Sequence, residues 1–483
     1  MGLFTVEELR EVISVKVLAG QDSLLGKRRI RQISTDSRSV RRGDLFVALK
    51  GDRYDGHEFV PAVLAQGAAG AIVHDEYRLP SSSASVRRID RPAPFLFGVR
   101  DPLFAYQQLA THHRSRFHIP IVAVTGSNGK TTTKDMVAAV LAQRWRVLKT
   151  EGNFNNRIGV PYTLFRLTAR HQAAVIEMGV DQQGQTTRLC EIVRPTIGLI
   201  TNIGPDHLEF FGSMEGSAQA KAEMLELLPA DGTAILNADD PYFDYLAARA
   251  QCRVISFGFS EMADVRASGV TSDVRQGTTF RLHLSGKSRP TIVRIKVHGT
   301  HNVTNALAAA AVGAALNLSG SMIAQGLGRF RPAAMRSQVV TNQGVHIIND
   351  CYNANPASMK AALQLLAQWS PARARVAVLG DMLELGPETR QMHRDVGQFL
   401  ATQGLSRLIV CGALGRDIAE GARQGGMAGS QIDEVVDTTA AADYLKRIVR
   451  QGDVVLVKAS RGMKMEQIVH VLTGMRAVTK QAS

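Results

Sequence analysis

The sequence has few cysteines and no long hydrophobic segment. Its four cysteines, Cys190, Cys252, Cys351 and Cys411, lie far apart and form no C-x-x-C pair, so neither a disulfide framework nor a paired-cysteine site is indicated. The longest run of small apolar residues, 306–316, is too short and too weakly hydrophobic to span a bilayer. The first residues lack the basic segment and apolar core of a signal peptide. We therefore expect a cytoplasmic protein with no membrane insertion.

Dense clusters of charge are also missing, although the formal net charge is +14. The most basic segment, residues 27–31, is short and carries no interleaved aromatic residues. We therefore expect a solvated surface there and no nucleic-acid partner. The positive excess would instead attract small polyanionic substrates into a cleft.

No repeat of solenoid length is present, and no G-x-G-x-x-G motif follows a strand of the C-terminal third, so a dinucleotide site there is unsupported. The 483 residues suffice for about three domains. Alternating strands and helices predict an α/β fold: a small mixed α/β domain over residues 1–101, a central P-loop ATPase-like domain with a parallel sheet over 102–330, and a C-terminal Rossmann-like, doubly wound domain over 331–483. Strands are expected at residues 44–49, 71–73, 121–124, 174–177, 197–200, 234–236, 345–348, 375–379, 407–410 and 454–457, a helix at 102–117, and a flexible loop at 80–85.

Residues 121–133 run from an apolar strand through a glycine-containing turn into an amphipathic helix. This order predicts a nucleotide triphosphate site, since backbone N–H groups, a helix N-terminus and Lys130 would all face the phosphates. Thr131 would offer a hydroxyl to Mg²⁺. The general P-loop pattern is incomplete, because Val124 stands where that pattern has a glycine. The candidate ATP-binding residues of the turn are Gly126, Ser127, Asn128, Gly129, Lys130, Thr131 and Thr132.

Three further residues are candidates for the metal site that a triphosphate requires. Glu177 ends an apolar strand, where parallel sheets place their ligands, but an ordinary strand-end carboxylate would look the same. His207 follows the next strand along the chain, although imidazole suits zinc better than Mg²⁺. Lys221 alone says little, because lysines are common on helix surfaces.

Together these residues resemble the Mur ligases, the ATP-dependent amide-bond-forming enzymes of peptidoglycan precursor synthesis. The resemblance extends over nearly the whole chain. The matching segments are residues 125–133, 177–179, 202–207, Lys221 and 299–305.

Within the family, three segments resemble the branch that joins D-alanyl-D-alanine to a UDP-N-acetylmuramoyl-tripeptide: the Asn-rich residues 151–161, residues 349–359 and residues 378–386. The D-N-P-R motif of the diamino-acid-adding ligases is absent. Another ligase of the family, one adding a single amino acid, stays as the alternative. No motif indicates the third residue of the tripeptide. A monomer is expected, although no motif fixes the oligomeric state.

The resemblance implies a catalytic set of four residues. Lys130 would bind the β- and γ-phosphates, and Thr131 with Glu177 would bind a first Mg²⁺. His207 and Lys221 would hold a second. In that role Lys221 would carry a CO₂-derived carbamate, which turns an ammonium into the anionic oxygen ligand that Mg²⁺ prefers.

The resemblance also implies binding residues outside the phosphate loop. Asn302 and Asp350 would contact the adenine nucleoside, and Arg336 the γ-phosphate. The uridine diphosphate substrate would be bound by Ser37, Arg38, Asn153, Asn155 and Asn156. Residues 458–463 depart slightly from the usual K-G-S-R string, which leaves the dipeptide contacts there open.

The implied chemistry begins with the substrate carboxylate, which is a poor electrophile because its charge is delocalised. ATP would convert it to an acyl phosphate, which the amine of the dipeptide then attacks. Two rivals come from other classes. A P-loop phosphotransferase or motor NTPase would not need the first-domain segment or residues 352–356, and a nucleic-acid-binding protein is suggested by charge alone.

Overall fold

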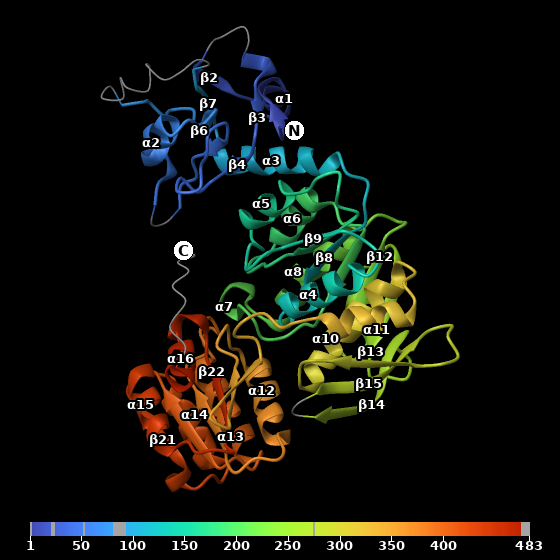
Figure 1. The fold of residues 1–483 in the computed structure, drawn as a ribbon, viewed down its shortest axis with the longest axis vertical. Coiled ribbons are helices and arrows are strands. Elements are labelled where there is room, and N and C mark those ends of the chain that lie inside the picture. Colours follow the sequence, from blue (N-terminus) through green and yellow to red (C-terminus); the bar gives the residue numbers. More distant parts are fainter. Residues whose placement is uncertain (1, 21–24, 52–53, 81–92, 274–275, 475–483) are drawn as a thin grey trace. The chain divides into compact units, whose positions relative to one another are not determined.

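The computed structural model describes residues 2–20, 25–51, 54–80, 93–273 and 276–474 (Figure 1). The chain divides into two compact units. The first comprises residues 1–121, 146–178 and 187–195, and the second comprises 122–145, 179–186 and 196–483. No helix in the described ranges is both long enough and apolar enough to cross a membrane.

The first unit contains a five-stranded sheet of order β2-β7-β6-β5-β4, in which only β2 is antiparallel to its neighbour. Helix α2 buries Val60, Val63 and Leu64 against Phe46 and Ala71 of this sheet. The bounds are β1 Phe4–Thr5, α1 Val6–Val12, β2 Lys16–Ala19, β3 Arg29–Ile30, β4 Ile33–Ser34, β5 Leu45–Val47, α2 Val60–Ala65, β6 Gly70–His74 and β7 Phe95–Val99. The strands predicted at 44–49 and 71–73 are β5 and β6, and most of the loop predicted at 80–85 lies outside the described residues.

Helix α3 (Pro102–Ser115) confirms the helix predicted at 102–117. It begins where it does because Asp101 Oδ1 accepts hydrogen bonds from the N–H groups of Leu103 and Phe104, and proline is favourable in a first turn. The first unit also holds a parallel pair of strands, β9 and β10. The bounds are β9 Val147–Lys149, α5 Gly159–Leu164 and β10 Ala173–Glu177, with α6 Gln185–Val193 lying mostly in this unit.

In the second unit, strands β8, β11, β12, β13 and β14 form a parallel run, and β15 and β16 extend it antiparallel. The apolar run at 306–316 lies almost entirely in α10, whose residues 305–313 are all buried, so it is an interior helix. The bounds are β8 Ile121–Thr125, α4 Lys130–Leu141, β11 Ile197–Ile200, α7 Leu208–Phe211, α8 Met214–Glu226, β12 Thr233–Asn237, α9 Phe243–Ala247, β13 Arg253–Gly258, β14 Val265–Asp273, β15 Gly277–Leu284, β16 Thr291–Ile295, α10 Thr300–Ala315 and α11 Gly320–Arg329.

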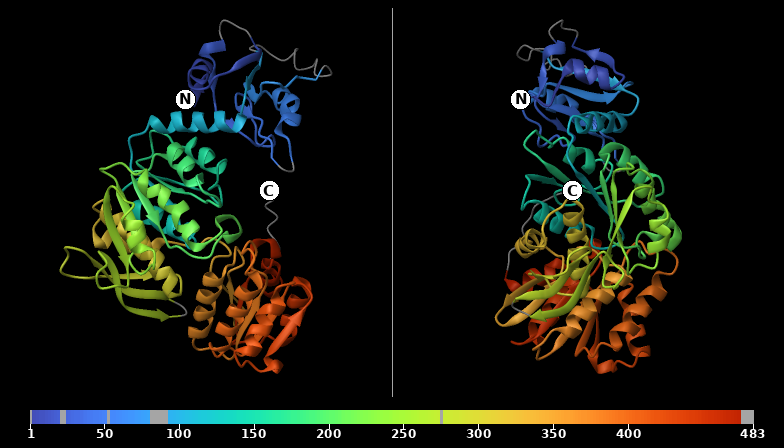
Figure 2. Two further views of the ribbon diagram at one scale, coloured as in Figure 1. Left: turned by 180° about the vertical axis from the view of Figure 1, so that it is seen from behind. Right: turned by 90° about the vertical axis from the view of Figure 1, so that its right-hand side faces the viewer.

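The C-terminal part of this unit is a six-stranded sheet of order β17-β18-β22-β19-β20-β21, parallel except for the edge strand β17. One hydrophobic core joins one face of the sheet to α12, α13 and α14, and a second joins the other face to α15 and α16, so helices cover both faces (Figure 2). The bounds are β17 Gln338–Asn342, β18 Val345–Asn349, α12 Pro356–Gln368, β19 Arg375–Leu379, α13 Thr389–Ala401, β20 Arg407–Cys411, α14 Gly415–Gln424, β21 Ile432–Val435, α15 Thr438–Ile448, β22 Val454–Lys458 and α16 Glu466–Thr473.

Candidate active site

The phosphate loop lies between β8 and α4, as the sequence predicts. Gly126 and Gly129 have φ values of 132° and 82°, in the region that favours glycine. A Cβ atom would also lie 2.1 Å from Thr201 Oγ1 at the first position and 2.4 Å from Asn305 Oδ1 at the second. Both glycines are therefore required by backbone conformation and by close neighbours.

Lys130 is the first residue of α4 and is partly buried. Its ammonium donates to the carbonyl oxygens of Gly126, at 2.5 Å, and Ser127, at 3.1 Å. The amine thus lies over the loop, at the end of a helix whose N-terminus already favours negative charge. Thr131 is buried in the first turn, and Thr132 is partly buried beside it.

The segment after β11 holds the loop in shape. Asn128 N–H donates to Asn202 Oδ1 at 3.0 Å, and Asn202 Nδ2 returns a bond to the Asn128 carbonyl at 3.1 Å. Ser127 Oγ donates to Asp206 Oδ1 at 2.6 Å and accepts from Gly204 N–H at 2.8 Å. The structure therefore brings residues 202–206 directly against the phosphate loop.

Lys221 is buried, with 1 % of its side chain exposed, and is not the surface lysine that its helical setting first suggests. Its ammonium donates to Ser217 Oγ at 2.6 Å and to Asp206 Oδ1 at 3.1 Å. Burial lowers the pKa of Lys221 to about 8, because desolvation and the charge of Lys130 outweigh the attraction of Asp206. Burial alone would raise the pKa of Asp206, but the ammonium groups of Lys221 and Lys130 hold it below its usual value, so Asp206 is anionic.

His207 has a positive φ of 49° and precedes α7. Its Nδ1 atom lies 2.8 Å from Glu384 Oε2. Both side chains are partly exposed, and the two atoms are in ion-pair range without hydrogen-bond alignment.

The start of α10 packs onto the loop helix. Thr133 Oγ1 donates to Asn305 Oδ1 at 3.1 Å, and Asn305 Nδ2 donates to Asn302 Oδ1 at 3.3 Å. Asn302 Nδ2 in turn donates to the carbonyl of His298 at 2.8 Å. The buried amide of Asn302 is thus linked through Asn305 to the helix that begins at Lys130.

Asp350 and Arg336 lie at the edge of the C-terminal sheet. Asp350 Oδ2 accepts from Lys458 Nζ at 2.6 Å and Oδ1 accepts from Ser337 N–H at 2.7 Å. The pKa of Asp350 lies below its usual value. Burial alone would raise this pKa, but the attraction of the Lys458 ammonium is stronger than that effect. The Arg336 guanidinium stacks 3.8 Å above the centre of the Tyr352 ring.

Glu177 ends β10 in the first unit. Its Oε1 accepts from Asn155 Nδ2 at 2.9 Å, so the strand end and the Asn-rich segment are in contact. Asn156 Oδ1 accepts from the N–H groups of Ile158 and Gly159, and its side chain therefore shapes the start of α5. Asn153 is exposed in the same segment.

Ser37 and Arg38 follow β4. Ser37 is partly exposed, and Arg38 makes a two-point contact with Asp36, with distances of 2.9 Å and 3.0 Å from Nε and Nη2. The hydroxyl groups of Ser34 and Ser39 stabilise this turn, because both donate hydrogen bonds to the carbonyl oxygen of Asp36. The exposed Arg38 guanidinium is thereby held in one orientation on the surface.

The donor atoms near the loop suit a hard cation. Asp206 Oδ2 is buried and has no hydrogen-bond partner within the described ranges, and carboxylate oxygens are what Mg²⁺ prefers. Within the described residues, no three His, Cys, Asp or Glu side chains lie close enough together to hold a metal ion. The imidazole of His207 is the less usual donor for Mg²⁺.

Three domain models of one family match the chain: "Mur ligase family, catalytic domain" over residues 29–108, "Mur ligase middle domain" over 124–313, and "Mur ligase, glutamate ligase domain" over 335–461. The chain belongs to the Mur ligase family. It is 37% identical over 444 residues to the UDP-N-acetylmuramoyl-tripeptide–D-alanyl-D-alanine ligase of Bacillus subtilis (strain 168), covering 91% of this chain and 92% of that one.

Two solved structures are similar to this Mur ligase along nearly their whole length. MurF from Acinetobacter baumannii has a TM-score of 0.86 at 32% identity, covering 98% of this chain and 99% of that one. MurF from Thermotoga maritima, solved in complex with ADP, has a TM-score of 0.80 at 27% identity, covering 92% and 97%. The α/β fold expected from the sequence is confirmed by this likeness.

Sequence reasoning missed three contact residues of this Mur ligase: Asp206, Asn305 and Lys458. The burial of Lys221 could have been predicted from its position in the helix, because it lies on the same face of α8 as Ala218 and Leu225, which are buried. A buried lysine calls for a partner such as Asp206. Lys458 ends a wholly buried strand, β22, and a charge in that position calls for a partner.

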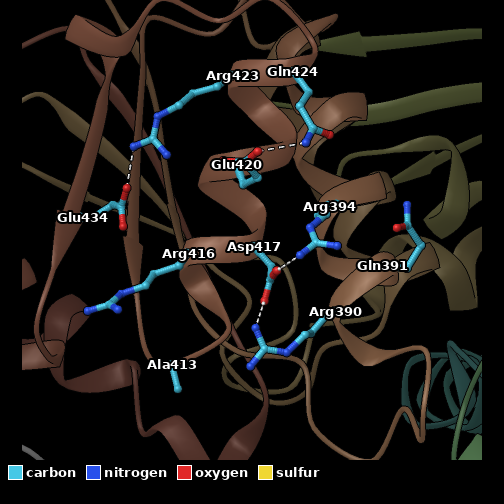
Figure 3. A pocket seen from close by; sticks show the side chains of 10 residues that line it. All are labelled: Arg390, Gln391, Arg394, Ala413, Arg416, Asp417, Glu420, Arg423, Gln424 and Glu434. Atoms are coloured by element: carbon cyan, nitrogen blue, oxygen red, sulfur yellow. Dashed lines mark hydrogen bonds and ion pairs between the residues drawn. The ribbon is translucent and has the colours of Figure 1, made fainter.

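A polar groove on α13 and α14 contains none of the candidate residues (Figure 3). Arg390 and Arg394 both reach the buried Asp417, at 3.4 Å and 2.9 Å, and Arg423 pairs with Glu434. These contacts balance most of the charge within the groove, so it is a structural ion-pair network between neighbouring elements.

Proposed function

We propose that this chain joins D-alanyl-D-alanine to a UDP-N-acetylmuramoyl-tripeptide, with hydrolysis of ATP to ADP and phosphate. The chain is an ATP-dependent ligase of the peptidoglycan pathway. The observation that carries the substrate assignment is the similarity to the Bacillus subtilis ligase of that name, which covers 91% of this chain and 92% of that one. We further infer that the protein is a monomer in the cytoplasm. We also infer three domains, at residues 1–101, 102–330 and 331–483.

In this proposal Lys130 binds the β- and γ-phosphates of ATP. Its ammonium already lies over the loop carbonyls, so it needs only to turn toward an incoming phosphate. The other loop residues, from Gly126 to Thr132, offer backbone N–H groups and hydroxyls to the phosphates. Asn302 and Asp350 contact the nucleoside, and Arg336 leaves the Tyr352 ring to meet the γ-phosphate.

Mg²⁺, when bound, neutralises the triphosphate and the departing phosphate. Thr131 and Glu177 are the proposed ligands of a first ion, and His207 and Lys221 of a second. We propose that Lys221 carries a carbamate, because CO₂ adds to a neutral amine and burial lowers the pKa of this lysine to about 8. Its ion pair with Asp206 would be lost on modification, since both groups would then be anionic.

The reaction has two steps. The terminal carboxylate of the tripeptide attacks the γ-phosphorus of ATP, which releases ADP and forms an acyl phosphate. The amine of the dipeptide, having lost a proton, then attacks the acyl carbon, and the carbon–oxygen bond to phosphate breaks. Ser37, Arg38, Asn153, Asn155 and Asn156 hold the UDP-linked substrate through both steps.

A coupled ADP-release assay with a panel of UDP-linked peptides and amines tests this function. Release should require UDP-N-acetylmuramoyl-tripeptide together with D-alanyl-D-alanine, while free D-alanine, lysine, diaminopimelate and glutamate should be much poorer. A site built for the amide and carboxylate of a dipeptide leaves polar groups unpaired with a single amino acid, which can discriminate by about 10⁴. Efficient turnover of a UDP-muramoyl-dipeptide with a free diamino acid, and none with D-alanyl-D-alanine, would overturn the substrate assignment.

A further inference from the structure

The turn at residues 380–386 follows β19 at the carboxyl end of a parallel sheet, where doubly wound folds bind their ligands. Three side chains pin its backbone. Asp381 Oδ1 accepts from the N–H groups of Leu414 and Gly415, each at 3.0 Å. Met382 N–H donates to His393 Nε2, and Leu383 N–H donates to Ser460 Oγ, both at 2.9 Å. These bonds fix the backbone of the turn, although the side chains of Leu383 and Glu384 are exposed.

Glu384 in this turn has a φ of 63°, a left-handed conformation that is strained for a non-glycine residue. Its side chain is 56% exposed, so no burial compensates for the strain. The preceding Leu383 is 44% exposed. Strained backbone of this kind is concentrated at active sites and ligand-binding sites.

The turn faces the region of the proposed metal site. Glu384 Oε2 lies 2.8 Å from His207 Nδ1, and a Cβ atom on Gly386 would lie 3.5 Å from the backbone of Glu209. Near His207, Oδ1 of the buried Asp206 carboxylate already accepts from Ser127 and from Lys221. Glu384 thus brings a second and more exposed carboxylate to this place.

An amine substrate arrives as an ammonium ion, and it must come close to Lys130 and a divalent cation, which repel it. A carboxylate at the entry side offsets that repulsion and fixes the orientation of the nitrogen through charge-assisted hydrogen bonds. We propose that Glu384 binds the ammonium group of D-alanyl-D-alanine and that Leu383 packs against the methyl group of its first residue. This inference rests on the proposed function and names two of its substrate contacts.

The test compares Glu384→Gln and Glu384→Asn with wild type in two assays. In the first, the KM for D-alanyl-D-alanine should rise at least about tenfold, while the KM values for ATP and the UDP-tripeptide stay within about threefold. In the second, hydroxylamine replaces the dipeptide and traps the acyl phosphate as a hydroxamate, with release of phosphate. Hydroxamate formation should be retained in both variants, since hydroxylamine is a neutral nucleophile that needs no carboxylate partner.

Glu388→Gln is the matched control, because Glu388 is an exposed carboxylate at the start of α13 that makes no capping hydrogen bond. Its kinetics should equal those of wild type. An unchanged dipeptide KM in the Glu384 variants would overturn the inference. So would a parallel loss of hydroxamate formation, which would mean that Glu384 only positions His207. Wild-type enzyme that makes hydroxamate but rejects D-alanyl-D-alanine would overturn the proposed function before any variant is compared.

Discussion

At the scale of single residues, Lys130 is the group on which nucleotide chemistry depends. Lys130→Ala should leave a folded protein whose ATP turnover is lower by about 10²–10³, because a charge that stabilises the transferring phosphoryl group is lost. ADP release and circular dichroism measure the two parts of this prediction. Lys446→Ala, which removes a surface lysine paired with Asp443, is the control. Turnover within tenfold of wild type would remove Lys130 from the site.

Lys221 carries the second prediction at this scale. Lys221→Ala should be inactive and partly rescued by millimolar formate or acetate, which return an oxygen ligand. In protein that lacks the carbamate, removing the lysine also takes away the ion pair of the buried Asp206 and so destabilises the fold. The double variant Lys221→Ala with Asp206→Asn therefore guards against unfolding. An active Lys221→Ala enzyme would contradict the carbamate.

His113 gives a prediction on pH. Burial lowers its pKa to about 4, against the weaker effect of its bond to the carbonyl of Leu167. The unfolded chain therefore binds the extra proton between about pH 6.5 and 4, and the free energy of unfolding should fall across that window as the pH falls, by up to about 3 kcal/mol. Thermal unfolding at several pH values measures the effect. His113→Gln, which does not titrate, should lack this part of the pH dependence; an identical dependence would disprove it.

At the scale of elements, α13 and α14 approach each other through glycines. A Cβ atom on Gly397 would lie 2.0 Å from the carbonyl oxygen of Ile418, and one on Gly421 would lie 2.0 Å from that of Arg394. Gly397→Ala should lower the free energy of unfolding by about 1–3 kcal/mol, since the helices must separate. Urea unfolding followed by circular dichroism measures the loss. Gly429→Ala, whose Cβ would meet nothing within 4 Å, should be neutral.

The positions of buried parallel strands are the part of the fold that the sequence predicts best. Strands such as β19 and β22 are buried on both faces, so they appear as short apolar runs between turn residues and could be predicted within one residue. The mutually antiparallel strands β14 and β15 were missed, because charged positions such as the partly exposed Arg266 and the exposed Arg281 interrupt their apolar residues. Contacts between distant segments, such as Lys458 with Asp350, depend on the sheet order and leave no local pattern.

At the scale of the whole molecule, the net charge of +14 has kinetic consequences. The value of kcat/KM for the anionic UDP-tripeptide should fall by about threefold or more between 20 and 200 mM KCl, since salt screens long-range attraction. D-alanyl-D-alanine is a zwitterion with no net charge, so its kcat/KM should change much less and serves as the control. Equal salt dependence for both substrates would disprove steering. An oligonucleotide should show no binding that weakens steeply with salt.

The strained turn at Glu384 has a consequence for anyone who tries to improve this protein by directed evolution. Glycine or asparagine would adopt its φ of 63° more easily, so a selection for heat resistance alone would reward replacement there. If Glu384 binds the incoming ammonium, the survivors of such a screen would be robust proteins that still consume ATP in the presence of hydroxylamine but lengthen the peptide only at much higher dipeptide concentrations. A library for thermostability should therefore keep position 384 fixed and draw its gains from the exposed helices elsewhere.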